Sequence, residues 1–421
     1  MLRWLSSLPP VVVAGCSDDT NTNPDPNTDQ LEIFSWWTSA SEAAALDALL
    51  SIFSRDHSTV EITNTAADAS LDARTELTRR MAEGLPPDLF QVNGGQSVGL
   101  WVSPSGEGDA DSAIESLEEL AQSGGWKSAI PQAVLDVVTF EGKVYAVPVN
   151  IHRINCLFYN KKVFNDYGLT PPTNLTEFFA VAAALEAVGI TPLSMGLNDK
   201  WVLGTTIWEN LVPAILGAQF YLDYLTGKKQ PKDPMLRDAL VQIGQMFDHV
   251  DLDARTLGWV DAVARVESGQ AAMNFMGDWA KGEFVAAGSV PDEDFGVVNW
   301  GDKIFVFTTD TFVLPHGAVN RQNALDLATI MGSIEGQDAF NPIKGSIPSR
   351  VDIDASLYDS ISKAAIDQFA AADTSLLQAT ALMVPNDFAD PVIEAFSTFV
   401  EDRNVDNLLQ TMANYYDLLQ R

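Results

Sequence analysis

Several tryptophans of this chain stand next to carboxylate or amide side chains, and that combination suits noncovalent binding. Trp36 and Trp37 follow the apolar run 31–34, and Trp279 directly follows Asp278. A flat aromatic ring covers C–H faces of a ligand, whereas carboxylates and amides hydrogen-bond to hydroxyls at its rim. Ligand pockets commonly combine apolar walls with a few fixed polar groups. These residue types therefore favour a binding site for a ligand rich in hydroxyls.

Two pairs of residues are expected at one edge of a sheet. Trp36 and Trp37 are adjacent at the end of an expected strand, so their side chains face opposite ways. We expect at least one of them at the carboxyl edge of the strand, where open α/β sheets bind ligands. Gln91 and Asn93 end the third expected strand at the same edge. The alternative is that both tryptophans pack in the core.

Strands alternate with helices around these residues. The expected order is a strand over 31–37, a helix over 42–53, a strand over 60–62, a helix over 71–83 and a strand over 88–92. Further strands are expected over 144–149, 157–160, 305–307 and 311–314, and helices over 177–188, most of 203–275, 320–331 and most of the remaining chain. Such alternation predicts βαβ units and a mainly parallel sheet with helices on both faces.

The two cysteines of the chain have different expected roles. Residues 1–16 contain one basic residue and end in the sequence VAGC, which is typical of a secretory signal that closes in a bacterial lipobox. Cys16 would then be lipidated and become the mature N-terminus, and the alternative is an incidental cysteine. The polar segment 17–30 predicts a flexible tether. Cys156 lies in an apolar run, which predicts a buried, inert thiol.

Length and charge limit the classes of function. The 421 residues are enough for two domains or one two-lobed unit. There are 57 acidic and 25 basic residues, which gives a net charge of −32. A phosphate backbone would be repelled by such a chain, so nucleic acid is excluded as a partner. An anionic membrane surface is disfavoured for the same reason.

Motifs for catalysis and for membrane insertion are missing from the sequence. The four histidines have no metal-ligand spacing, and neither a Gly-x-Ser-x-Gly motif nor a phosphate-binding glycine loop occurs. We therefore expect no metal, no cofactor and no enzymatic activity. The longest uncharged apolar run after the leader, near 211–222, is too short to span a bilayer.

Six segments resemble one family in their order and spacing over nearly all of 31–421. The chain is similar to the family-1 extracellular solute-binding proteins of ABC sugar importers, especially the branch that binds glucose and related hexoses. The segments are 31–37 (LEIFSWW), 86–92 (PPDLFQV), 147–153 (VPVNIHR), 269–279 (GQAAMNFMGDW), 336–342 (GQDAFNP) and 344–347 (KGSI).

The resemblance implies a two-lobed periplasmic-binding-protein fold of the α/β class, with a hinge and a ligand cleft between the lobes. The chain would cross between lobes near 147–150, 310–314 and 344–347. The N-terminal lobe would comprise 31–148 and 313–345, and the C-terminal lobe 149–312 and 346–421. Closure of the lobes would trap the ligand.

The resemblance also implies a set of binding residues. Glu42 would be a sugar-binding carboxylate, although a carboxylate in the first turn of a helix also complements the helix dipole. Asp310 at the second crossing would bind sugar hydroxyls, and Lys344 at the third would be its counter-charge. Trp279 would be the stacking platform of the other lobe. Trp259 would be a second wall, or else a core residue.

Other positions are expected at the rim or outside the site. Asn93 stands where glucose-binding relatives carry histidine or lysine. Gln378 stands where they carry histidine. Both departures put the identity of the hexose in question. Gln91 would also bind the sugar. Asp278 is expected to cap the following helix, and His152 to be a structural histidine.

The resulting hypothesis is a lipoprotein receptor of an ABC carbohydrate importer, outside the cytoplasmic membrane. It would be a monomer that binds a monosaccharide or small saccharide, with glucose or a related hexose preferred, and delivers it to the membrane permease. A receptor for an oligosaccharide or a polyol is one alternative. A glycoside hydrolase that uses Glu42 and Asp310 as opposed carboxyl groups is another, and a structural surface protein is a third.

Overall fold

The computed structural model describes residues 29–66, 71–103 and 111–420. The signal and lipobox predicted for 1–16, with Cys16, and most of the predicted tether lie outside the described residues. Gln30, the last residue of the predicted tether, is instead the first residue of a strand.

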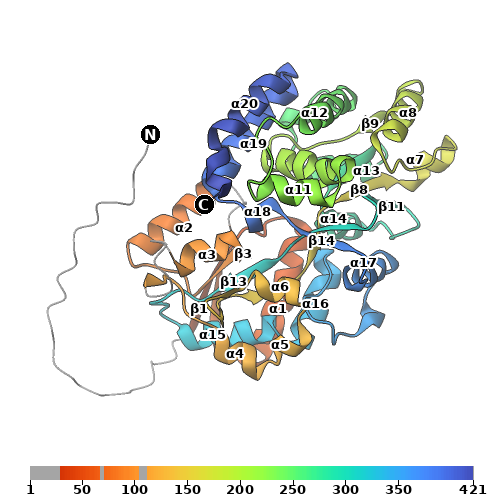
Figure 1. The fold of residues 1–421 in the computed structure, drawn as a ribbon. Coiled ribbons are helices and arrows are strands. Elements are labelled where there is room, and N and C mark those ends of the chain that lie inside the picture. The colour runs from red at the N-terminus through yellow and green to blue at the C-terminus, as the bar shows by residue number, and fades with distance from the viewer. Residues whose placement is uncertain (1–28, 67–70, 104–110, 421) are drawn as a thin grey trace, which may run out of the picture.

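A five-stranded sheet is the centre of one half of the molecule (Figure 1). Its strands, in order, are β2 (Glu61–Ala66), β1 (Gln30–Ser35), β3 (Leu89–Asn93), β13 (Asp310–Val313) and β6 (Val147–Pro148). The first three are parallel and are connected by α1 (Ala40–Asp56) and α2 (Leu71–Ala82), which confirms the predicted βαβ units. The prediction of a mainly parallel sheet is wrong, because most strand pairs of the described residues are antiparallel. β13 lies between β3 and β6 and runs antiparallel to both. Segments distant in sequence therefore meet at one sheet edge.

Two further sheets and a short hairpin complete the strands. The four-stranded sheet has the order β11 (Phe295–Asn299), β8 (Cys156–Asn160), β10 (Ala271–Met276) and β9 (Thr191–Leu193). The three-stranded sheet has the order β14 (Ser375–Gln378), β12 (Ile304–Thr308) and β7 (His152–Arg153), and β4 (Thr139–Phe140) pairs with β5 (Lys143–Val144).

Helices cover the sheets of both halves (Figure 1). On the side of the five-stranded sheet these are α3 (Gln96–Val102), α4 (Glu118–Ser123), α5 (Trp126–Ala129), α6 (Gln132–Asp136), α15 (Arg321–Met331) and α16 (Ile334–Lys344). The others are α7 (Lys161–Asp166), α8 (Leu175–Glu186), α9 (Trp201–Leu203), a π-helix (Gly204–Leu211), α10 (Val212–Leu216), α11 (Ala218–Leu225), α12 (Pro234–Met246), α13 (Trp259–Glu267), α14 (Trp279–Ala286), α17 (Ser360–Ala370), α18 (Thr380–Met383), α19 (Asn386–Asp402) and α20 (Val405–Tyr415). Short 3₁₀ turns are Phe247–His249, Ala254–Thr256, Ala355–Leu357 and Tyr416–Gln420.

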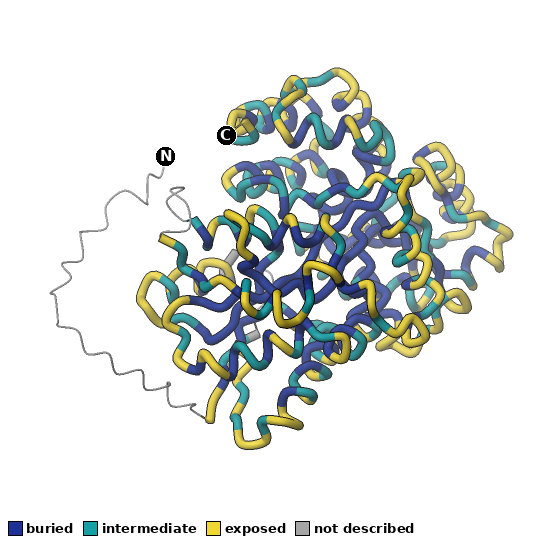
Figure 2. The backbone as a smooth tube through the Cα atoms, turned by 60° about the horizontal axis from the view of Figure 1, so that its bottom comes forward, coloured by how far each residue is buried: buried dark blue, intermediate teal, exposed yellow. Residues whose placement is uncertain are grey.

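Buried backbone runs through the middle of both halves, and exposed segments lie at their rims (Figure 2). In the second half Phe284 stacks on Phe295 with 4.5 Å between ring centroids and on Phe158 with 5.6 Å. Cys156 is a free, buried thiol, and burial raises its pKa to about 12. The predicted burial of this thiol is confirmed, and its inertness stays a prediction that the raised pKa supports, because the thiolate is the reactive form.

Four sequence-based assignments of secondary structure differ from the structure. β1 ends at Ser35, so Trp36 and Trp37 lie beyond the strand, and α1 begins at Ala40, not at Glu42. The stretch 203–275, predicted to be mostly helical, includes part of β10, and the C-terminal stretch includes β14. All six residues of β10 are buried. A short apolar run buried on both faces has the same pattern in a strand and in a helix, so periodicity could not separate them.

The segments that connect the halves lie side by side. The chain passes between the five-stranded and three-stranded sheets at 149–151 and again at Thr309. The Val149 amide donates to the carbonyl of Asp310, and the Ile151 amide to that of Ile347. The first two positions lie at or beside the crossings predicted near 147–150 and 310–314. The crossing predicted at 344–347 stays a prediction, because beyond it the Val351 amide still donates to the carbonyl of Ala129 in α5. Gly345, which ends α16, has φ of 93°, and a Cβ atom there would lie 2.6 Å from the carbonyl oxygen of Asp278.

Replacement of Gly345 by alanine tests this close packing. Gly345→Ala adds left-handed strain of about 1–2 kcal/mol and a contact with backbone that cannot move freely, so we expect a total loss of roughly 3 kcal/mol. Urea-induced unfolding measures it. Gly168→Ala is the matched control, because φ is 60° and a Cβ atom would meet nothing within 4 Å. Equal losses for the two variants would contradict the packing argument.

Candidate functional site

The carboxylate of Asp310 is the centre of the site. It lies at the start of β13, where it is buried, and side chains from two other segments donate to it. Gln91 Nε2 lies 3.1 Å from Oδ1, and Asn150 Nδ2 lies 2.8 Å from Oδ2. His152 Nε2 lies 3.1 Å from Oδ2. A carboxylate has about four lone-pair sites, so these contacts leave room for a ligand hydroxyl.

Asp310 is held in its charged form. Burial would raise its pKa, but the hydrogen bond and charge of His152, the charge of Lys344 and the hydrogen bond of Asn150 together lower the pKa to about 2. The carboxylate is therefore ionised at neutral pH and accepts hydrogen bonds only. Hydrogen bonds to such a group are stronger than those to a neutral acceptor.

A second ion pair lies beside this carboxylate. Lys344, at the end of α16, is buried, and its Nζ lies 3.1 Å from Oε1 of Glu42. The other oxygen of Glu42 accepts from the Ser39 amide at the start of α1. The neighbouring Ser41 donates through its amide and hydroxyl to Glu283 of α14. Glu42 thus pairs with Lys344 and also satisfies the helix terminus.

Three partly exposed tryptophans form a chain of ring contacts. Trp279, at the start of α14, lies edge-on to His152 with 5.2 Å between ring centroids. Its ring is 6.0 Å from that of Trp201, which is in turn 6.5 Å from that of Trp259. Trp201 was not among the predicted residues. The signal for it was its place at the start of α9, the first helix after β9, on the carboxyl side of a strand.

The adjacent pair of tryptophans is split between the core and the surface. Trp37 is only 1% exposed and packs against Phe312 and Phe340, with ring centroids 5.4 and 4.9 Å away. Trp36 keeps part of its surface exposed, and its amide donates to Gln91 Oε1 at 3.1 Å. Trp36 therefore adjoins the Asp310 network, whereas Trp37 is a core residue.

The structure changes the roles expected for two residues. Asp278 precedes α14, but its side chain makes no capping hydrogen bond. Its carboxylate instead contacts His152 Nδ1 and accepts from the Arg153 amide at 2.9 Å. The capping prediction for Asp278 is therefore wrong, because two donors from β7 compete for the same oxygens. His152 is a satisfied, buried histidine as predicted, but its partners include the central carboxylate.

The remaining predicted residues lie at the edge of this network. Asn93 is partly exposed and stands opposite Asp310 in the β3–β13 register. Gln378 ends β14 and lines an open hollow of about 410 Å³, together with Gly95, Gln96 and Leu382.

The Thr308 hydroxyl, opposite His152 in register, is buried without a hydrogen-bond partner in the described part of the chain. A ligand hydroxyl or a water molecule would satisfy it.

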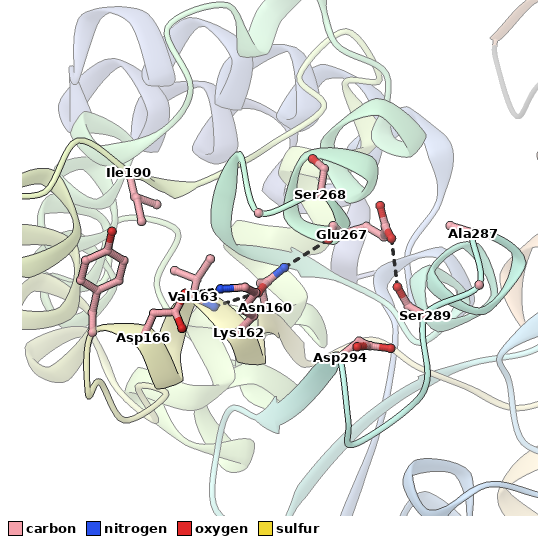
Figure 3. A pocket seen from close by; sticks show the side chains of 13 residues that line it. Asn160, Lys162, Val163, Asp166, Ile190, Glu267, Ser268, Ala287, Ser289 and Asp294 are labelled. Carbon is pink, nitrogen blue, oxygen red and sulfur yellow. Dashed lines mark hydrogen bonds and ion pairs between the residues drawn. The ribbon is translucent and has the colours of Figure 1, made fainter.

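A second hollow, of about 520 Å³, lies away from these residues (Figure 3). Asn160 in its wall donates to the carbonyls of Val266 and Glu267, and Ser289 donates to the Glu267 carboxylate at 3.0 Å. These polar groups already bond to one another, so they serve the packing of α7, α13 and the turn after α14.

The described residues are 29–66, 71–103 and 111–420. In these ranges no three His, Cys, Asp or Glu side chains are grouped so that they could hold a metal ion. In the same ranges no helix combines the length and the apolar character that a membrane crossing requires.

The sequence of this chain matches a family model over residues 35–338, and that model describes the bacterial extracellular solute-binding proteins. The chain belongs to this family. Its members are solute-binding proteins.

Several solute-binding proteins are similar over most of the chain. An uncharacterized ABC transporter extracellular-binding protein of Pyrococcus horikoshii is 32% identical over 96% of this chain and 92% of its own length. A probable sugar-binding periplasmic protein of Mesorhizobium japonicum is 30% identical over 80% of each chain. The xylose/arabinose-binding protein of Haloferax volcanii is 26% identical over 78% of this chain and 71% of its own length.

Solved structures show the two-lobed fold. A bacterial solute receptor with an exclusive preference for β-D-galactopyranose superimposes with a TM-score of 0.81, and covers 93% of this chain and 99% of its own. Its sequence identity is 19%, so the likeness concerns the fold. The predicted two-lobed α/β fold of the periplasmic-binding-protein type is confirmed.

The pKa of Asp310 gives this solute-binding protein a characteristic acid response. Because the folded pKa is about 2 and the unfolded value 3.8, the contribution of Asp310 to stability is complete above pH 3.8. It is lost as the pH falls through 2, by about 2 kcal/mol in total. We expect the advantage of wild type over Asp310→Asn in urea unfolding to shrink from pH 5 to pH 2.5. A constant difference would show that the carboxylate is not stabilised as an anion.

Proposed function

We propose that this protein is the substrate-binding receptor of an ABC carbohydrate importer and that it captures a sugar, with glucose or a related hexose preferred. The observation that carries the proposal is the ionised, buried Asp310 carboxylate, which still has a lone pair for a hydroxyl. Trp279 lies one residue from Asp278 and borders the same network, so it offers an aromatic face. Similar proteins include a probable sugar-binding periplasmic protein and a xylose/arabinose-binding protein.

The proposed capture uses both lobes. We propose approximate lobes of 31–148 with 313–345 and of 149–312 with 346–421, except that residues 310–312 go with the first lobe because β13 belongs to the five-stranded sheet. Trp36, Glu42 and Gln91 would contact the sugar from the first lobe, and Trp259 with Trp279 from the second. Closure around the crossings would bury the sugar, and the closed form would be recognised by the membrane permease. The protein would act as a monomer, without chemistry on its ligand.

A glycoside hydrolase is disfavoured by the state of the two acidic residues. Such an enzyme needs a general acid whose pKa is raised, opposite a second carboxyl group. The pKa of Asp310 is lowered to about 2, and Glu42 forms an ion pair with Lys344. Asp310 therefore supplies no proton at neutral pH. A receptor for a pentose, an oligosaccharide or a polyol keeps the same chemistry and remains the alternative for the ligand.

A panel of sugars tests receptor function. A ligand that binds only the folded state stabilises it by about 2.7 kcal/mol at a concentration of 100 times Kd. We expect the unfolding temperature to rise with the concentration of D-glucose, D-galactose or D-mannose. A shift with D-xylose, L-arabinose or maltose alone would keep the receptor and discard the hexose. If no sugar or polyol shifts it and a glycoside is hydrolysed, the receptor proposal is wrong.

Substitutions in the proposed site test how the sugar is held. Loss of a hydrogen bond to a charged group costs about 1.5–3 kcal/mol, so Asp310→Ala should weaken sugar binding by roughly 10- to 100-fold. Trp279→Ala should weaken it comparably through lost stacking. Trp101→Ala is the matched control, because Trp101 is also partly exposed but packs on Phe90. Calorimetric titration that shows equal affinities for all three variants would contradict the site.

The proposed location is extracytoplasmic, with an anchor on Cys16. The anchor rests on the VAGC sequence at 13–16. We expect Cys16→Ser to move the protein from the membrane fraction of cells to the soluble fraction, and Cys156→Ser to leave it at the membrane. Equal fractionation of the two variants would rule out the lipid anchor.

A further inference from the structure

His152 lies between the two halves of the proposed sugar site. It is on β7, directly after one crossing, and only 2% of it is exposed. Nδ1 contacts the carboxylate of Asp278, and Nε2 lies 3.1 Å from Oδ2 of Asp310. The imidazole therefore bridges the carboxylate of Asp310, at the start of β13, and that of Asp278, directly before α14.

The number of protons on this ring decides whether both carboxylates have a donor. A neutral imidazole has one N–H and an imidazolium has two. If Nδ1 keeps its proton for Asp278, a neutral ring presents a bare Nε2 to Oδ2 of Asp310. Asn150 Nδ2, 3.0 Å from Nε2 and 2.8 Å from Oδ2, would then be the only donor between two facing acceptors. The charged ring carries a proton on Nε2 and so removes the repulsion between Nε2 and Oδ2 of Asp310.

The same ring adjoins the aromatic wall. Trp279 follows Asp278 directly, and its ring stands at 88° to the imidazole, edge-on at 5.2 Å between centroids. Asp278 is fixed by His152 and by the Arg153 amide. A displacement of His152 therefore reaches the Asp310 carboxylate through one ring nitrogen, and the start of α14 with Trp279 through the other.

Several charged groups of the described residues act on the imidazole. Asp278 and Asp310 face it, and the Lys344 ammonium, paired with Glu42, opposes its charge from the end of α16. The Arg153 guanidinium, next along β7, donates elsewhere, to Gln368 and to the carbonyl of Ile304. Burial would lower the pKa of His152, but the charge of Asp278 and the hydrogen bonds with both carboxylates raise the pKa above its ordinary value.

We propose that His152 is a positioning residue of the sugar site, which holds Asp310 and Trp279 in register while it carries a proton and loosens both when it loses that proton. The inference rests on the proposed sugar-binding function. Loss of this proton would make sugar retention dependent on pH without any contact between His152 and the sugar.

The pH profile of sugar affinity tests this proposal. The full chain is titrated calorimetrically with D-glucose, or with whichever sugar of the panel gave the largest thermal shift, from pH 6 to pH 9.5. We expect affinity to fall on the order of tenfold as the pH rises. His152→Gln should bind more weakly at pH 6 and show a flat profile. His249→Gln is the matched control, since His249 contacts Glu186 outside the site, and it should keep the wild-type profile.

A second variant keeps the test decisive if His152→Gln fails to fold. Asp278→Asn removes the charge that favours the imidazolium, so the fall in affinity should move to lower pH. A flat wild-type profile, or an unchanged midpoint in Asp278→Asn, would overturn the role of His152 and leave the receptor intact. If wild type binds no sugar at any pH, the proposed function fails together with this inference.

Discussion

A buried carboxylate needs hydrogen-bond donors from the protein, and the structure around the crossings supplies them to Asp310. Gln91 comes from the end of β3, while Asn150 and His152 come from the connection between two sheets. Each donor is in place only if β13 lies between β3 and β6 in the observed register. The ionised group therefore depends on the fold, and its remaining hydrogen-bonding capacity is what the fold offers to a ligand.

The fold also brings apolar surface to this polar centre from another part of the chain. Trp279 stands at the start of α14, and Gly345 lets α16 approach the same turn closely. Trp201 and Trp259 extend the ring contacts from the starts of α9 and α13. Ser41 and Glu283 join α1 to α14 beside them. Polar and aromatic groups thus meet at the crossings, where a small rotation of one half changes both sets of contacts.

The sequence was sufficient for the local pattern but not for its long-range partners. Alternation of strands and helices predicted β1, β2, β3 and their helices. The six segments between 31–37 and 344–347 predicted the family. β10 was missed because a fully buried strand has no alternation. The contact of Asp278 with His152 was missed because an aspartate before a helix is ordinarily a cap. Trp201 carried no local signal stronger than its position after a short strand, since its neighbours are distant in sequence.

A crystal structure of the complex with the best-binding sugar of the panel tests the central claim most directly. The account predicts a sugar hydroxyl within hydrogen-bonding distance of an Asp310 carboxylate oxygen and a sugar face against the ring of Trp279. A sugar bound only in the open hollow lined by Gln378, or in the hollow beside α7, with Asp310 making no contact to it, would contradict the account.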